Sequence, residues 1–301
     1  MEQANFSDSN PLVSVYMPTH NRGVLIARAI DSVLNQTYKN IELIICSDGS
    51  TDETVEVLQQ YTEKDPRVSY VVNETSRGAC FARNRCIELA KGDFITGLDD
   101  DDEFTEDRIK IFVDFHFSSK KDILTATRFY KNDAKINVGD IYQGDITSEM
   151  LGNANLIGNQ VFTKTAYLRE LGGFDINFPA WQDYDMWYRL VYRFGNCFKL
   201  SQPTYIFYVD ENRPRITTGS RAYAGYRMFI EKHANTLSKE QHKSLFFQDL
   251  MNRGQAITLI SLLNNFTVTN AKVYLKEKLK HIALIKLIYS LISKKRTFSK
   301  I

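Results

Sequence analysis

The chain has 301 residues, of which 43% are hydrophobic and 25% are charged, and its formal net charge at pH 7 is +2. This composition is ordinary for a globular protein and excludes a disordered, collagen-like or disulfide-stapled chain. The four cysteines include no CxxC pair and the five histidines show no ligand spacing. This favours buried thiols in a reducing compartment over a zinc or redox site.

The N-terminal residues are not expected to form a secretory signal. Its first ten residues, MEQANFSDSN, are polar and acidic, without a basic segment followed by an apolar one. No window reaches the ~18 to 20 apolar residues that span a bilayer. The closest candidate, 282–292, contains Lys286. We therefore expect a cytoplasmic protein.

Short β-branched runs alternate with amphipathic segments over the first hundred residues. Asp52 and Glu53, behind Ser50 or Thr51, are typical of a helix N-terminus. The alternation predicts a mostly parallel sheet covered by helices. The predicted strands are 13–17, 41–46, 68–72 and 94–98, and the predicted helices are 24–35, 51–61 and 79–90.

The pattern is looser after residue 102. We expect a helix at 105–117, a strand at 123–130, an irregular stretch to about residue 159, a helix at 183–194 and a last strand at 206–209. From residue 219 onward the sequence reads as helical. The predicted organisation is an α/β domain over 1–218, with halves of about 1–102 and 103–218, and a helical region over 219–301.

Polar side chains follow three of the four predicted strands. The runs are PTHNR at 18–22, SDGSTD at 47–52 and DDDD at 99–102. Ligands bind beyond the carboxyl ends of the strands in open α/β sheets, so these runs indicate one shared site.

The four consecutive aspartates, 99–102, indicate a divalent cation. Like charges this close raise one another's pKa unless a cation compensates. A solvated acidic turn is the alternative, and the spaced ligands of an EF-hand are missing. Mg²⁺ or Mn²⁺, held by one or two carboxylates and by substrate phosphates, fits this pattern.

Phosphate-binding loops of the common types are absent. Neither GxGxxG after the first strand nor GxxxxGK[ST] occurs, which argues against a dinucleotide dehydrogenase and a P-loop NTPase. Arg77 and Arg83 flank the start of the third predicted helix and are placed to neutralise a diphosphate, with surface solvation as the alternative.

Five segments in order carry a specific resemblance. They are VSVYMPTHNR (13–22), IELIICSDGSTDET (41–54), RGACFARNRCIELAKGDFITGLDDDD (77–102), LGGFD (171–175) and WQDYDMWYRL (181–190). Over about residues 12 to 215 the chain resembles the family-2 glycosyltransferases. The resemblance implies the GT-A (nucleotide-diphospho-sugar transferase) fold, with a mostly parallel sheet flanked by helices and a helical C-terminal extension.

The resemblance implies a donor site for a UDP-sugar. Asp48 would read the uracil ring, with Ser47 in place of the family's first acid. Asp99 would lie on the ribose side and Asp101 would bind Mn²⁺ or Mg²⁺. Because the whole run is Asp, the register could shift by one, so Asp100 and Asp102 remain alternatives. The remaining donor-binding residues implied are Pro18, Thr19, His20, Arg22, Arg77, Arg83 and Asp100.

The second acidic motif of the family is Glu-Asp, and here it is Gln182-Asp183. Asp183 takes the position of the catalytic base, and Trp181, Gln182 and Asp185 lie on the acceptor side. Asp183 as a helix N-cap is the structural alternative.

These roles predict an inverting transfer. A base removes the proton of an acceptor hydroxyl as it attacks the anomeric carbon, and the metal and arginines stabilise the departing diphosphate. A single displacement gives a β-linkage. The family suggests a carbohydrate or lipid-linked acceptor in bacterial polysaccharide or lipopolysaccharide synthesis. A sugar-phosphate nucleotidyltransferase, which would need a glycine-rich basic loop, and an inactive UDP-sugar-binding protein are the alternatives. A nucleic-acid partner is disfavoured.

Residues 272–301 hold nine Lys or Arg and one Glu, a charge of +8. Leu, Ile and Tyr at helical spacing make this a basic amphipathic segment, which favours an anionic membrane surface at the cytoplasmic face of the inner membrane. A helix packed on the domain and a homodimer contact are the alternatives. Arg213 and Arg215 are candidates for a loop that closes over the diphosphate.

Overall fold

The structure is a computed structural model that describes residues 10–132, 135–209 and 219–280. The chain forms two compact units, one of residues 1–151 and 155–214 and one of residues 152–154 and 215–301. Arg213, Arg215 and the segment 281–301, on which part of the membrane prediction rests, lie outside the described residues.

The first unit is built on a ten-stranded sheet in the order β3-β2-β1-β4-β9-β6-β10-β5, with β7 paired to β6 and β8 to β10. The strands β3, β2, β1 and β4 are parallel, as predicted. The short strand β9 is antiparallel to both β4 and β6. Its bounds and those of the other strands are: β1 Val13–Thr19, β2 Ile41–Asp48, β3 Val68–Asn73, β4 Phe94–Gly97, β5 Glu103–Phe104, β6 Ile123–Asn132, β7 Lys135–Val138, β8 Gly144–Ile146, β9 Phe162–Lys164 and β10 Cys197–Tyr208.

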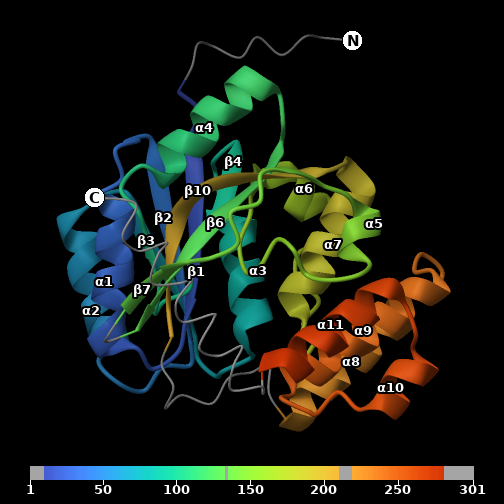
Figure 1. The fold of residues 1–301 in the computed structure, drawn as a ribbon. Coiled ribbons are helices and arrows are strands. Elements are labelled where there is room, and N and C mark those ends of the chain that lie inside the picture. The colour runs from blue at the N-terminus through green and yellow to red at the C-terminus, as the bar shows by residue number, and fades with distance from the viewer. Residues whose placement is uncertain (1–9, 133–134, 210–218, 281–301) are drawn as a thin grey trace. The chain divides into compact units, whose positions relative to one another are not determined.

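Helices cover both faces of this sheet, with α1 and α2 on one side and α3 on the other (Figure 1). A core joins β1 to α1, α2 and α4 because Val13, Val15 and Met17 alternate along β1 toward that face. Tyr16 points to the opposite face, where its ring lies 6.1 Å from that of Phe174. The helices are α1 Gly23–Leu34, α2 Thr54–Lys64, α3 Ala79–Leu89, α4 Arg108–Ser119, α5 Ser148–Leu151, α6 Thr165–Glu170 and α7 Gln182–Phe194.

The strand order reverses at β1, because the chain leaves β1 toward β2 and β3 and returns to β4 on its other side. Such a reversal opens a crevice at the carboxyl ends of the strands. The segments after β1 and β4, which carry the predicted PTHNR and DDDD motifs, therefore meet there.

Several predicted elements need correction. The second helix begins at Thr54 rather than Thr51, because Asp52 Oδ1 accepts the backbone N–H of Thr54 at 3.1 Å and ends the turn there. The last strand begins at Cys197, nine residues earlier than predicted. The stretch expected to be irregular contains β7, β8 and α5, and the short elements β5, β9 and α6 were not predicted.

Residues 219–280 of the second unit are mainly helical, as predicted. Its helices are α8 Gly219–Lys232, α9 Lys239–Asn252, α10 Leu259–Asn264 and α11 Val268–Lys280. Ser238 with Gln241 and Thr258 with Ser261 form capping boxes that begin α9 and α10. A small core of Phe247, Ile257 and Leu262 joins α9, α10 and α11. Among the described helices of the whole chain, none is long and apolar enough to cross a membrane.

Candidate active site

Asp48, at the end of β2, lies in a ring of hydrogen-bond donors. Its carboxylate accepts Asn73 Nδ2 at 2.8 Å, Ser76 Oγ at 2.9 Å, and the backbone N–H groups of Arg77 and Gly78, the latter at 2.7 Å. Burial alone would raise the pKa of Asp48, but these hydrogen bonds outweigh burial and lower it. Asp48 is therefore a fixed, ionised acceptor.

Gly49 lets the chain approach this close. Its φ is +67°, and a Cβ there would lie 2.4 Å from the backbone nitrogen of Ser76. Asp48 and Gly49 of the predicted motif thus have different roles. Asp48 accepts hydrogen bonds, and Gly49 lets the 73–78 segment come close enough to donate them.

The segment after β1 lies beside Asp48. Pro18 and Thr19 are the last residues of β1, and Thr19 is buried. His20 Nδ1 is 2.7 Å from the backbone oxygen of Asp48. Arg22 Nε is 3.5 Å from Asp100 Oδ1, so the ends of β1 and β4 are joined by an ion pair. The predicted donor-binding residues of the 18–22 segment therefore lie together with Asp48 and Asp100 at one edge of the sheet.

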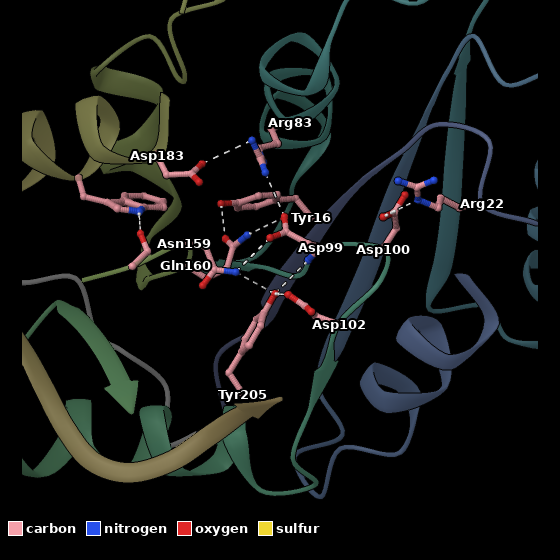
Figure 2. Close-up of polar contacts among 12 residues, drawn as sticks. Tyr16, Arg22, Arg83, Asp99, Asp100, Asp102, Asn159, Gln160, Asp183 and Tyr205 are labelled. Carbon is pink, nitrogen blue, oxygen red and sulfur yellow. Dashed lines mark hydrogen bonds and ion pairs between the residues drawn. The ribbon is translucent and has the colours of Figure 1, made fainter. Parts of the chain in front are cut away.

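The four aspartates after β4 have different environments. Asp99 faces Arg83, whose Nη2 is 3.0 Å from its Oδ1 (Figure 2). Burial and the nearby charge of Asp101 raise the pKa of Asp100 to about 6. The backbone oxygen of Asp101 accepts a hydrogen bond from Arg28 Nη2.

Asp102 belongs to the fold rather than to an open ligand site. It is 1% exposed, and its carboxylate accepts Tyr205 OH at 2.8 Å and the backbone N–H of Tyr208 at 2.9 Å. Burial, with Asp99 and Asp101 close by, raises its pKa well above the usual range. The structure therefore disfavours the alternative in which Asp102 is a metal ligand. Both carboxylate oxygens of Asp102 accept hydrogen bonds from β10.

Arg83 connects the two acidic motifs. Its side chain is 7% exposed, and it reaches Asp99 with Nη2 at 3.0 Å and Asp183 with Nη1 at 3.5 Å (Figure 2). Asp99 and Asp183 are 84 positions apart in the sequence, yet the guanidinium of Arg83 pairs with both. Its charge is offset by both carboxylates, which is how a buried cation is tolerated.

Asp183 lies in the first turn of α7, not at its N-cap. The cap position is Trp181, with φ +66°, so the N-cap alternative is wrong. Burial raises the pKa of Asp183 to about 6, although the charge of Arg83 lowers it and that of Asp99 raises it again. A carboxylate with this pKa is ionised at neutral pH and still basic enough to take a proton.

Three predicted residues make contacts outside this group. The Arg77 guanidinium lies over the Phe81 ring at 3.5 Å, and only its backbone contacts Asp48. Asp185 is fully buried and pairs with Arg189 at 2.9 Å. The Trp181 ring stacks on Tyr184 at 5.3 Å. Gln182, half-buried at the start of α7, stays an acceptor-side prediction together with them.

Five residues of the site were missed by sequence reasoning. Asn159 Nδ2 and Gln160 Nε2 bond the two oxygens of Asp99 at 3.0 Å and 3.2 Å. They lie at the end of the stretch predicted to be irregular, where no element was predicted, and the pairing of β9 with β4 brings them beside Asp99. The other three, which contact this pair, are Tyr16, Arg128 and Tyr205.

A divalent cation fits the donor set of the 99–101 segment only with help from a ligand. The described residues contain no group of three or more His, Cys, Asp or Glu side chains that could hold a metal by themselves. A hard cation held by one or two carboxylates and completed by phosphate oxygens needs no such group.

Comparisons with known proteins agree with this geometry. The sequence model of "Glycosyl transferase family 2" matches residues 14–171. An Escherichia coli (strain K12) glycosyl transferase named for colanic acid biosynthesis, WcaA, is 37% identical over 276 residues, which cover 88% of this chain and 96% of that protein.

A more distant relative and a solved structure are also similar to this chain. The Escherichia coli enzyme named UDP-Glc:alpha-D-GlcNAc-diphosphoundecaprenol beta-1,3-glucosyltransferase, WfaP, is 31% identical, with 60% of this chain and 70% of that protein covered. The solved structure of S. aureus TarS 1–349 in complex with UDP-GlcNAc has a TM-score of 0.68 at 16% identity, covering 88% of this chain and 78% of that one. This likeness shows the GT-A fold. The chain belongs to glycosyl transferase family 2 and is a glycosyltransferase, which removes the nucleotidyltransferase alternative.

Proposed function

We propose that the protein transfers a sugar from a UDP-sugar to a hydroxyl group of a carbohydrate or lipid-linked acceptor in bacterial polysaccharide synthesis. The observation that carries the proposal is the arrangement in which Arg83 joins Asp99, on the donor side, to Asp183, on the acceptor side. The name of WcaA supports a role in polysaccharide synthesis. The name of WfaP and the UDP-GlcNAc complex of TarS support a UDP-sugar as the donor.

Asp48 and Asp99 would bind the nucleoside of the donor. The Asp48 carboxylate is held ionised by its donors and accepts the N–H of the uracil ring, while His20 lies against the same segment. Asp99 accepts a ribose hydroxyl. Neither carboxylate needs to move on binding, which lowers the entropic cost of recognition.

Asp183 is the proposed general base. It takes the proton of the acceptor hydroxyl as that oxygen attacks the anomeric carbon, and the bond to the diphosphate breaks in the same displacement. One displacement inverts the anomeric centre, so an α-linked donor gives a β-linkage. Arg83 stabilises the ionised form of Asp183 between turnovers.

Mn²⁺ or Mg²⁺ is the proposed cofactor, with Asp101 as its ligand from the protein and Asp100 beside it. When bound, such a cation neutralises the charge that develops on the departing diphosphate. Arg22, paired with Asp100, and Arg83 add positive charge at the same edge of the sheet.

We also propose that the second unit lies on an anionic membrane surface. Residues 219–280, which form the described helical part of this unit, contain ten Lys or Arg and four Asp or Glu. Large apolar side chains are exposed on α10 and α11, among them Ile260 at 71%, Leu263 at 65% and Val268 at 68%. Exposed apolar and basic groups together suit the headgroup region of a bilayer.

Sedimentation with vesicles tests the membrane proposal. Binding to phosphatidylglycerol vesicles but not to phosphatidylcholine vesicles, lost in Ile260→Ser with Leu263→Ser, is the expected result. Equal recovery in the supernatant with both lipids would contradict it, and a concentration-dependent dimer that the same substitutions abolish would assign the face to a second copy of the chain.

UDP release from a panel of UDP-sugars, with Mn²⁺, Mg²⁺ or EDTA, tests the transfer itself. Turnover of one donor that requires metal and rises on adding an acceptor is the expected result, and the anomeric configuration of the product, measured by NMR, checks inversion. An α-configured product would overturn the mechanism. Absence of metal-assisted UDP binding in the wild type would overturn the donor assignment.

A further inference from the structure

The neighbouring carboxamides of Asn159 and Gln160 donate hydrogen bonds to the carboxylate of Asp99. Asn159 Nδ2 donates to Asp99 Oδ2 at 3.0 Å, and Gln160 Nε2 donates to Asp99 Oδ1 at 3.2 Å (Figure 2). Arg83 Nη2 adds a third donor on Oδ1. With two donors on Oδ1 and one on Oδ2, the remaining acceptor capacity of Asp99 is concentrated on Oδ2.

Each carboxamide oxygen accepts a hydrogen bond from a side chain on a strand of the sheet. Arg128 Nη1, on β6, donates to Asn159 Oδ1 at 3.2 Å, and Tyr16 OH, on β1, donates to Gln160 Oε1 at 2.8 Å. A guanidinium can only donate and an ionised carboxylate can only accept. The Asn159 amide therefore has one orientation that satisfies both neighbours, and the same holds for Gln160 between Tyr16 and Asp99.

The backbone at Gly158 provides the room for Arg128. Gly158 has φ +94°, and a Cβ there would lie 1.5 Å from Arg128 Nη2, which itself donates to the backbone oxygen of Ile157 at 3.3 Å. The Gly158 oxygen accepts Trp187 Nε1 at 3.0 Å. The loop that carries the two carboxamides is thus fastened to β6 and α7.

We propose that Asn159 and Gln160 are positioning residues, whose amides orient Asp99 so that Oδ2 meets the ribose of the donor, with Arg128 and Tyr16 setting the direction of each amide. The proposal rests on the donor role of Asp99 given above. It assigns a function to the segment before β9, which lies between the two acidic motifs in sequence and contributes no reacting group.

Calorimetric titration of the full-length protein with UDP and Mn²⁺ tests the positioning role of Asn159 and Gln160. In Asn159→Asp and Gln160→Glu the shape is kept but the donor to Asp99 is lost, and we expect UDP affinity to fall about tenfold or more at about pH 8. Tyr16→Phe removes only the outer donor and should cost about threefold. Gln143→Glu is the matched control, because Gln143 is an exposed carboxamide that contacts Ser201.

Acid should restore the two carboxylate variants. Two carboxylates in hydrogen-bond contact cannot both stay ionised, so the introduced group takes a proton as the pH falls, and its O–H then donates to Asp99 as the amide did. The ratio of variant to wild-type dissociation constants should therefore fall toward one at about pH 5.5. General damage to the fold would not be repaired by acid.

Four results separate the outcomes. Affinities equal to that of Gln143→Glu at both pH values would overturn the positioning role, as would a loss that is the same at both. If the two carboxylate variants do not fold, a Tyr16→Phe protein with wild-type affinity would overturn it. Failure of the wild type to bind UDP would instead reject the donor site itself.

Discussion

Two aspartates of the site, Asp48 at the end of β2 and Asp183 in α7, have opposite environments: Asp48 is buried among hydrogen-bond donors, whereas the Asp183 side chain is 23% exposed. Asp48 accepts hydrogen bonds from two side chains and two backbone N–H groups, and its pKa is lowered. Within the described residues Asp183 forms one ion pair, with Arg83 at 3.5 Å, and its pKa is raised to about 6.

The difference shows how one residue type is given two roles. Burial acts on both carboxylates in the same direction, and the number of donors decides the result. A carboxylate saturated with donors is a poor base but a rigid acceptor, which suits recognition. A carboxylate with few donors keeps its basicity near neutral pH, which suits proton transfer.

Removing the base should have the largest effect. In Asp183→Asn we expect the rate of sugar transfer to fall about 10³-fold, within the range for loss of a general base. The measurement is the steady-state rate with donor and acceptor, with Asp114→Asn as control, since Asp114 is exposed and its carboxylate pairs with Lys110 on the surface of α4. A variant with a tenth of the wild-type rate would contradict the role of Asp183.

Removing the fixed acceptor should have the next largest effect. Asp48→Asn turns a donor toward the N–H groups of Arg77 and Gly78, and we expect UDP affinity to fall about 30-fold. CDP lacks the N–H that the Asp48 carboxylate would accept, so its affinity should change less. Equal losses for UDP and CDP, measured by calorimetry, would show that Asp48 supports the fold without reading the base.

The ion pairs that join Asp183 to Asp99 can be removed at Arg83. In Arg83→Met the positive charge that lowers the pKa of Asp183 is lost, so that pKa should rise above about 6. The acidic limb of the kcat–pH profile should then move upward by about one unit, and Arg83→Lys should restore part of the shift. If the acidic limb does not move, the group that titrates in it is not Asp183.

The smallest expected effect is on stability, where the two aspartates should differ in sign. The folded pKa of Asp183, about 6, lies above the ~3.9 of an unfolded chain, so its ionisation costs stability increasingly from about pH 4 to 6. Asp183→Asn should therefore stabilise the protein at pH 7 by up to about 2 kcal/mol, with no gain near pH 4.

Asp48 should behave in the opposite way. Its folded pKa is lowered, so it contributes stability above about pH 4 that is lost as the pH falls through the folded value. Asp48→Asn should lower the melting temperature at pH 7. Melting curves of both variants across pH test the pair together, and shifts of the same sign would contradict the assigned environments.

Much of the donor side could be predicted from the sequence. The order of β1 to β4, their parallel pairing and the gathering of 18–22, Asp48 and Asp99 at one edge follow from local signals, because strand ends and turn residues lie next to one another in the chain. The family itself is confirmed by the match over residues 14–171.

Only the tertiary structure decided the rest, and the physical reason is distance along the chain. Asn159 and Gln160 reach Asp99 across about sixty positions because a three-residue strand, too short for a periodic signal, runs antiparallel to β4. The run 99–102 is uniform in sequence, and partners from distant elements make Asp99 part of the site and Asp102 part of the core. Sequence supplied the carboxylates, and long-range contacts set the environment of each.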